Sequence, residues 1–165
     1  MSGVYRFTYT GKWEDRWFYE LDNSEKVFWL WVCDHADIGG FLDFPGIAQI
    51  QGVLRCSNEE AIKVFDSIKK PCLISKEDGT PKLLWIRNFV KHQKNYPIYV
   101  KKGAHRSIVK KYVAMKEVFW FDEGFKEFYI KFIEPCLKQM EAYYEMLKEK
   151  REGKVATTAA SGKDF

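Results

Sequence analysis

The sequence predicts a mainly helical α+β fold, because three helical patterns follow one another closely and two short apolar runs come directly after them. Turn-forming residues separate the two apolar runs, which is typical of a β-hairpin. Helices followed by such a hairpin form a winged helix-turn-helix in which the hairpin is a small wing. A long amphipathic pattern near the carboxyl end predicts one long helix after this domain.

Two helices are predicted at the start of the chain. Residues 13–21, WEDRWFYEL, repeat apolar side chains at four-residue steps and predict a short helix. Asp22 and Glu25 have the spacing of a capping box, in which each side chain accepts a hydrogen bond from the other residue's backbone N–H. A second helix, over residues 25–37, therefore begins there, and the glycine pair at 39–40 ends it.

A short strand and two more helices are predicted next. Residues 41–44 favour a strand, and residues 46–54 favour a helix. Ser57 and Glu60 form another capping box, which begins a helix over residues 58–70. The positions of this helix that helical spacing predicts to be buried are Ala61, Ile62, Phe65 and Ile68.

The hairpin comes next in the chain. Its strands are the runs at 72–75 and 82–87, CLIS and KLLWIR, with turn residues between them. A helical turn, NFVKHQ, and a loop lead to a helix over residues 104–115. The inward positions predicted for this helix are Ile108, Val109, Tyr112 and Val113, with Arg106 and Lys110 on the opposite face.

The carboxy-terminal part reads as one amphipathic helix from Asp122 to Glu152, which Pro135 should kink. The predicted organisation is a winged-helix domain over residues 1–116, a long helix over 117–152 for packing or oligomerisation, and a disordered tail over 153–165. A helix of this length is more than a small domain can cover. We therefore expect a homo-oligomer formed through it.

The sequence predicts a cytoplasmic protein that does not enter a membrane. No apolar stretch approaches the roughly 18 residues of a membrane-spanning helix, and the start of the chain does not have the pattern of a secretory signal. The four cysteines are scattered and have no metal-ligand or redox spacing, so we expect reduced thiols: Cys33, Cys56, Cys72 and Cys136.

Positive charge is concentrated in one segment of the chain. Residues 82–116 contain ten lysines and arginines and no aspartate or glutamate, whereas the segments before and after carry net charges of −4 and −2. Surfaces that are merely solvated usually mix both signs. The segment therefore predicts a polyanionic partner, and DNA is the partner we expect.

The side chains expected to neutralise DNA phosphates are basic residues in and near this segment. They are Lys91, Lys94, Lys101, Lys102, Arg106, Lys110 and Lys111, with Arg87 and, on the helix over 58–70, Lys63. Tyr96, Tyr99 and His105 lie among them and could stack on bases. For Tyr96 and Tyr99 the favoured interpretation is that the rings pack under the loop.

The helix over 58–70 occupies the position from which a winged helix commonly reads the major groove. Its charges sum to zero, and the wing tip adds Glu77 and Asp78, which DNA phosphates would repel. Groove reading by this helix is therefore not assumed. The alternative function is a protein-interaction module, either a replisome adaptor or an inhibitor of a host protein, that does not bind DNA.

No enzyme activity, cofactor or metal is expected. The chain has no nucleophile with a spaced base and no phosphate-binding glycine loop. Cys33 and His35 are two residues apart, so on a helix they point about 200° away from each other and cannot share an ion. We expect His35 and Asp37 to brace the end of their helix instead.

Four stretches of the chain, in order, carry a resemblance: WEDRWFYEL, CDHADIGGFLDF, LLWIRNFVKHQ and GAHRSIVKKY. Together they resemble the amino-terminal winged-helix domain of phage replication initiators and replisome organisers, the DnaD-like group, over about residues 11–115. The resemblance implies a DNA-binding, often self-associating module that marks an origin and helps to load the replicative helicase or contacts another replication protein. Such initiators usually have a second, carboxy-terminal domain, whereas here one long helix follows.

Overall fold

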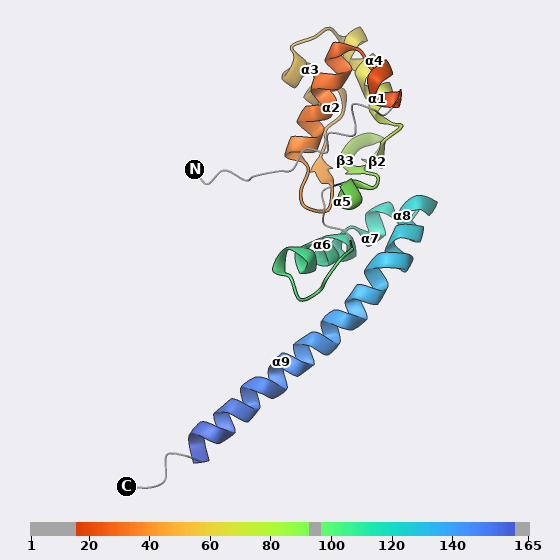
Figure 1. The fold of residues 1–165 in the computed structure, drawn as a ribbon. Coiled ribbons are helices and arrows are strands. Elements are labelled where there is room, and N and C mark those ends of the chain that lie inside the picture. Colours follow the sequence, from red (N-terminus) through yellow and green to blue (C-terminus); the bar gives the residue numbers. More distant parts are fainter. Residues whose placement is uncertain (1–15, 93–96, 161–165) are drawn as a thin grey trace. The chain divides into compact units, whose positions relative to one another are not determined.

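The computed structural model describes residues 16–92 and 97–160 of the chain (Figure 1). It divides into two compact units, residues 1–97 and 98–165. The boundary therefore lies between Pro97 and Ile98 and not at residue 116, where the sequence analysis placed it. The predicted helix over 104–115 belongs to the second unit, because its apolar face packs against the helices that follow it.

The described part of the first unit is a bundle of short helices on a small sheet, as the mainly helical α+β prediction requires. Its elements in chain order are α1 (Arg16–Glu20), α2 (Asn23–His35), β1 (Phe41–Asp43), α3 (Ile47–Leu54), α4 (Asn58–Ile68), β2 (Cys72–Glu77), β3 (Thr80–Ile86) and α5 (Phe89–His92). The predicted start of α1 at Trp13 lies outside the described residues.

Both predicted capping boxes are present and fix where α2 and α4 begin. The Asp22 carboxylate accepts a hydrogen bond from the Glu25 N–H at 2.8 Å, and the Glu25 carboxylate accepts one from the Asp22 N–H at 2.7 Å. Ser57 and Glu60 make the same reciprocal pair at the start of α4. Each box provides acceptors for backbone N–H groups that the first helical turn would otherwise leave unbonded.

The three strands form an antiparallel sheet in the order β1-β3-β2. Asp78 and Gly79 connect β2 to β3, and both have positive φ, 49° and 79°. A two-residue turn of this kind matches the right-handed twist of paired strands. The hairpin turn is thus shorter than the six-residue stretch that the sequence analysis assigned to it.

The core of the first unit lies between α2, α3, α4 and the sheet. Its largest fully buried side chains are Phe18, Phe28, Phe44, Ile50, Ile68 and Leu84. The predicted inward position Ile62 is wrong: its side chain is 42% exposed, and Val64 is buried instead. At Gly40, where φ is +84°, an added Cβ would lie 2.6 Å from the Phe89 Cβ, so α5 approaches the backbone too closely for any side chain there.

The second unit is helical throughout its regular structure. Its elements are α6 (Gly103–Ala114), α7 (Lys116–Phe119), α8 (Glu123–Phe128), a π-helical turn (Tyr129–Ile133) and α9 (Glu134–Ala160). Tyr112 of α6 is fully buried and stacks on Phe125 and Phe128, with ring centroids 5.7 and 5.0 Å away. Ile108 and Val109 are buried as predicted, whereas Val113 is exposed, contrary to the prediction.

The long carboxy-terminal helix is confirmed, with differences at both ends and in the middle. It begins at Glu123 as α8, widens into the π-helical turn just before Pro135, and continues as α9. Pro135 has no N–H to donate to an α-helical partner, so the irregularity lies where the kink was expected. The helix does not end at Glu152 but continues to Ala160, so the predicted disordered tail is helical over 153–160, and residues 161–165 lie outside the described residues.

Within residues 98–160, α6 lies beside the first part of α9, and the rest of α9 extends past it (Figure 1). No helix in the described part of the chain is both long enough and apolar enough to cross a membrane.

Candidate nucleic-acid interface

The predicted phosphate-binding residues are divided between the two units. Lys63, Arg87 and Lys91 belong to the first unit. Lys101, Lys102, Arg106, Lys110 and Lys111 belong to the second. Lys94 and Tyr96 lie outside the described residues. The second unit therefore carries the larger group, with Lys101, Lys102 and Arg106 at the start of α6 and Lys110 and Lys111 toward its end.

The segment that leads into α6, residues 98–102, is here called the entry loop. Side chains of α6 hold the backbone of the entry loop through three hydrogen bonds. The His105 Nδ1 accepts a hydrogen bond from the Tyr99 N–H at 2.8 Å. The Arg106 guanidinium donates to the carbonyl oxygens of Val100 and Lys101 at 2.8 and 3.0 Å. The Val100 side chain is buried, so the loop is also anchored by an apolar contact.

Tyr99 is displayed on this loop, contrary to the prediction that its ring packs beneath it. Its side chain is 53% exposed. The ring stacks on His105, with centroids 6.0 Å apart and planes 23° apart, and the Lys102 ammonium lies 5.4 Å from its centroid. Burial, and secondarily the charge of Lys102, lowers the pKa of His105, which favours the neutral ring that can accept the Tyr99 N–H.

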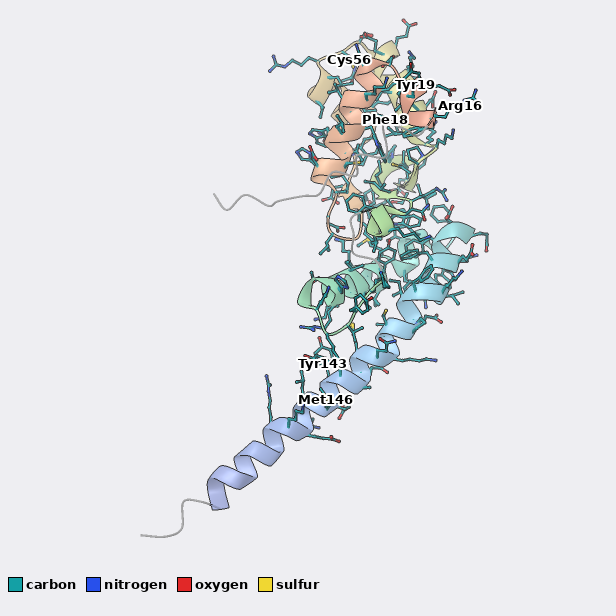
Figure 2. All side chains as sticks on the ribbon, viewed as in Figure 1. Arg16, Phe18, Tyr19, Cys56, Tyr143 and Met146 are labelled. Atoms are coloured by element: carbon teal, nitrogen blue, oxygen red, sulfur yellow. The ribbon has the colours of Figure 1, made fainter. Side chains whose placement is uncertain are left out.

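Arg106 has a second set of contacts that the sequence did not predict. Besides its two carbonyl acceptors, its guanidinium lies 5.4 Å from the centroid of the Tyr143 ring of α9 (labelled in Figure 2). The side chain thus connects the entry loop to α9. Its position in the basic segment suggested a phosphate contact, but its hydrogen bonds go to backbone carbonyl oxygens of the protein itself.

Three lysines of the second unit have cationic groups available to an anion. Lys101, Lys102 and Lys110 are exposed, and no carboxylate of the described residues forms an ion pair with any of them. Lys111 is half-buried. By contrast Lys116 of the same basic segment lies over the rings of Trp120 and Tyr129, at 4.7 and 5.2 Å.

The cations of α4 are engaged in ion pairs. Lys63 forms one with Asp22 at 2.6 Å, and this pairing raises the pKa of Lys63. Lys69 pairs with Asp66 of the same helix at 2.5 Å. In the β2–β3 hairpin, Lys82 pairs with Glu77. These contacts mean that α4 and the hairpin present little net positive charge.

Residues that could suggest a metal have structural contacts instead. His35 stacks on Trp31, with its Nδ1 2.8 Å from the Trp31 carbonyl oxygen. The Asp37 carboxylate accepts hydrogen bonds from the Gly39 and Phe41 N–H groups at 2.9 and 3.0 Å. Both residues therefore brace the end of α2 as predicted. Among the described residues, no three His, Cys, Asp or Glu side chains cluster as a metal site would require.

Comparisons of this chain with known proteins found no matching family model, no similar curated protein and no similar solved structure. The resemblance to phage replication initiators stays a prediction from the sequence, and the function below is argued from the residues.

Proposed function

We propose that this protein contains a winged helix in its first unit, that it binds DNA through the basic segment, residues 82–116, chiefly by lysines of the second unit, and that it acts in the initiation of phage-type DNA replication. The observation that carries the DNA-binding part is the separation of charge along the chain. All of the excess positive charge lies in a segment without one carboxylate. The link to replication rests on the resemblance of the four sequence stretches.

The arrangement of the first unit supports the winged-helix part of the proposal. Three helices, α2, α3 and α4, precede the β2–β3 hairpin, and β1 pairs with β3 on the side away from β2. This order of helices and hairpin supports the proposal that the hairpin is a wing.

The contact itself is expected to come from phosphate neutralisation and not from groove reading by α4. Exposed lysines at 101, 102 and 110 can each release a condensed counterion when they meet a phosphate. Lys63 and Lys69 of α4 are already paired with carboxylates, and breaking those pairs would offset part of any gain.

Salt dependence tests the proposal most directly. Fluorescence anisotropy of the full chain with labelled single-stranded and duplex DNA would be measured at 50 and 200 mM salt. If the three exposed lysines of the second unit engage phosphates, affinity for a single strand should fall about 20-fold over this range. An affinity that does not change with salt would contradict phosphate neutralisation.

A pair of charge-matched variants locates the contact. Reversing Lys101, Lys102 and Lys110 to glutamate should abolish binding at 200 mM salt. Reversing three exposed lysines of α9, Lys138, Lys148 and Lys150, changes the net charge equally and should weaken binding only slightly. Equal losses in the two variants would mean that overall charge, and not this surface, controls binding.

The second candidate function is protein binding through α4. Ile62 is a large apolar side chain that is 42% exposed on a helix whose lysines are paired, and such a surface suits a protein partner better than a phosphate backbone. Absence of DNA binding at both salt concentrations would favour this function. In that case Ile62→Asp should abolish activity in a replication assay, while the triple variant at residues 101, 102 and 110 should retain it.

A further inference from the structure

Tyr99 is the starting point, because it is the one exposed aromatic residue within the described part of the basic segment. The other described rings there belong to Trp85, Phe89, His105 and Tyr112, and all are buried. Exposed rings in the second unit outside the segment have acidic neighbours: Phe121 precedes Asp122 and Glu123, and Tyr144 precedes Glu145. Among the described residues of the second unit, Tyr99 alone combines an exposed ring with a surrounding of lysines and no acidic sequence neighbour.

We propose that Tyr99 is a stacking platform for an unpaired DNA base, so that the basic segment binds single-stranded DNA in preference to duplex. This inference rests on the proposed function, because it assigns the strand type to the same surface. Stacking of bases on aromatic side chains within a positively charged groove is how many proteins hold single strands without reading their sequence. Paired bases in a duplex do not offer their faces to such a ring.

The ring is held in place before any DNA arrives. The Tyr99 N–H is bonded to His105, and the carbonyl oxygen of Tyr99 accepts the Lys102 N–H at 3.0 Å. Arg106 fixes the next two carbonyls of the loop. Since the backbone on both sides of the ring is ordered by the protein itself, a base that stacks there orders little else.

The two faces of the ring are not equivalent. His105 stacks on the ring in an offset arrangement, with centroids 6.0 Å apart, so it occupies part of one face. The Lys102 ammonium lies over the ring, 5.4 Å from its centroid, and this exposed side chain has to turn aside for a base that stacks on the same face. Lys102 and the exposed Lys101 can then meet the phosphates of a nucleotide whose base rests on Tyr99.

The experiment compares strand types in the full chain. Labelled 12-nucleotide oligothymidylate and a duplex of the same length would be titrated with wild type, Tyr99→Ala, Tyr99→Trp and the control Phe121→Ala. We expect Tyr99→Ala to weaken single-strand binding about ten-fold, the loss typical for removing one stacking ring. Duplex binding should change less than about two-fold, and Tyr99→Trp and Phe121→Ala should bind the single strand like wild type.

Each other outcome is decisive. If Tyr99→Ala binds oligothymidylate like wild type while the variant reversed at 101, 102 and 110 does not bind, the stacking inference is wrong and the proposed function stands. If wild type binds neither DNA at 50 mM salt, both are wrong. If Tyr99→Ala loses both strand types equally, or amide exchange shows the entry loop unprotected in that variant, Tyr99 acts through loop structure and the stacking inference is wrong.

Discussion

Replacing Arg106 with alanine separates a structural role of this side chain from a DNA contact. The change removes two hydrogen bonds to the carbonyls of Val100 and Lys101 and the contact with the Tyr143 ring. For a half-buried arginine each hydrogen bond contributes about 1 kcal/mol. The cation–π contact adds about 0.5 kcal/mol. We therefore expect the opening free energy of α6 and the entry loop to fall by about 2.5 kcal/mol.

Hydrogen exchange followed by mass spectrometry measures this free energy in the second unit alone. Peptides covering residues 98–115 should exchange about 70-fold faster in Arg106→Ala. Arg106→Lys keeps the charge, but its ammonium does not reach as far as the one guanidinium nitrogen that makes both hydrogen bonds, so it should lose about half of the stabilisation. The salt dependence of DNA binding should stay close to wild type in both variants. Unchanged exchange, together with a salt slope lower by about 0.7 in Arg106→Ala, would show that Arg106 is a phosphate contact and refute the structural assignment.

Three further predictions concern pH, backbone conformation and self-association. Because the pKa of His105 is lowered in the folded unit, the imidazole of the unfolded chain takes up a proton at a higher pH than that of the folded chain. The contribution of His105 to the free energy of unfolding is therefore complete above about pH 6.5 and is lost as the pH falls below it. His105→Gln should remove this loss when unfolding is followed against pH. Gly40→Ala should destabilise the first unit by more than about 2 kcal/mol in chemical denaturation, because positive φ and a steric clash act together, whereas Gly79→Ala, with positive φ in open space, should cost about 1 kcal/mol. If α9 forms the expected homo-oligomer, glutamates at the exposed Tyr144 and Met146 (Met146 is labelled in Figure 2) should reduce the molar mass measured by light scattering to that of one chain, and a wild type that is already monomeric would contradict the expectation.

Local signals allowed most elements of the fold to be predicted. The capping boxes at Asp22 and Ser57 involve residues three apart, so their geometry follows from spacing alone. Burial was harder to predict. Ile62 and Val113 are apolar residues of amphipathic helices, but each lies at the margin of the buried face of its helix. Whether such a marginal side chain is buried depends on the neighbouring helices and strands, which helical periodicity does not specify.

The candidate interface was predicted in composition but not in geometry. Counting charges identified the basic segment, because charge is a property of the sequence itself. The roles of Arg106 and Tyr99 depend on how the entry loop folds back on α6, and a bond such as that from the Tyr99 N–H to His105 has no signature in composition. Two neighbouring basic residues of one segment, Lys102 and Arg106, thus have different contacts for reasons that only the tertiary arrangement reveals.

The π-helical turn at Tyr129–Ile133 also sets the rotational phase of α9. Five residues in a wider turn leave everything beyond them rotated by up to about 100° from where an unbroken α-helix would direct it. In that rotated setting Tyr143 contacts Arg106. Deleting a single residue from the turn would leave each helix intact on its own, yet it would direct Tyr143 away from the entry loop. The π-helical turn therefore determines which side chains of the 27-residue helix α9 face α6.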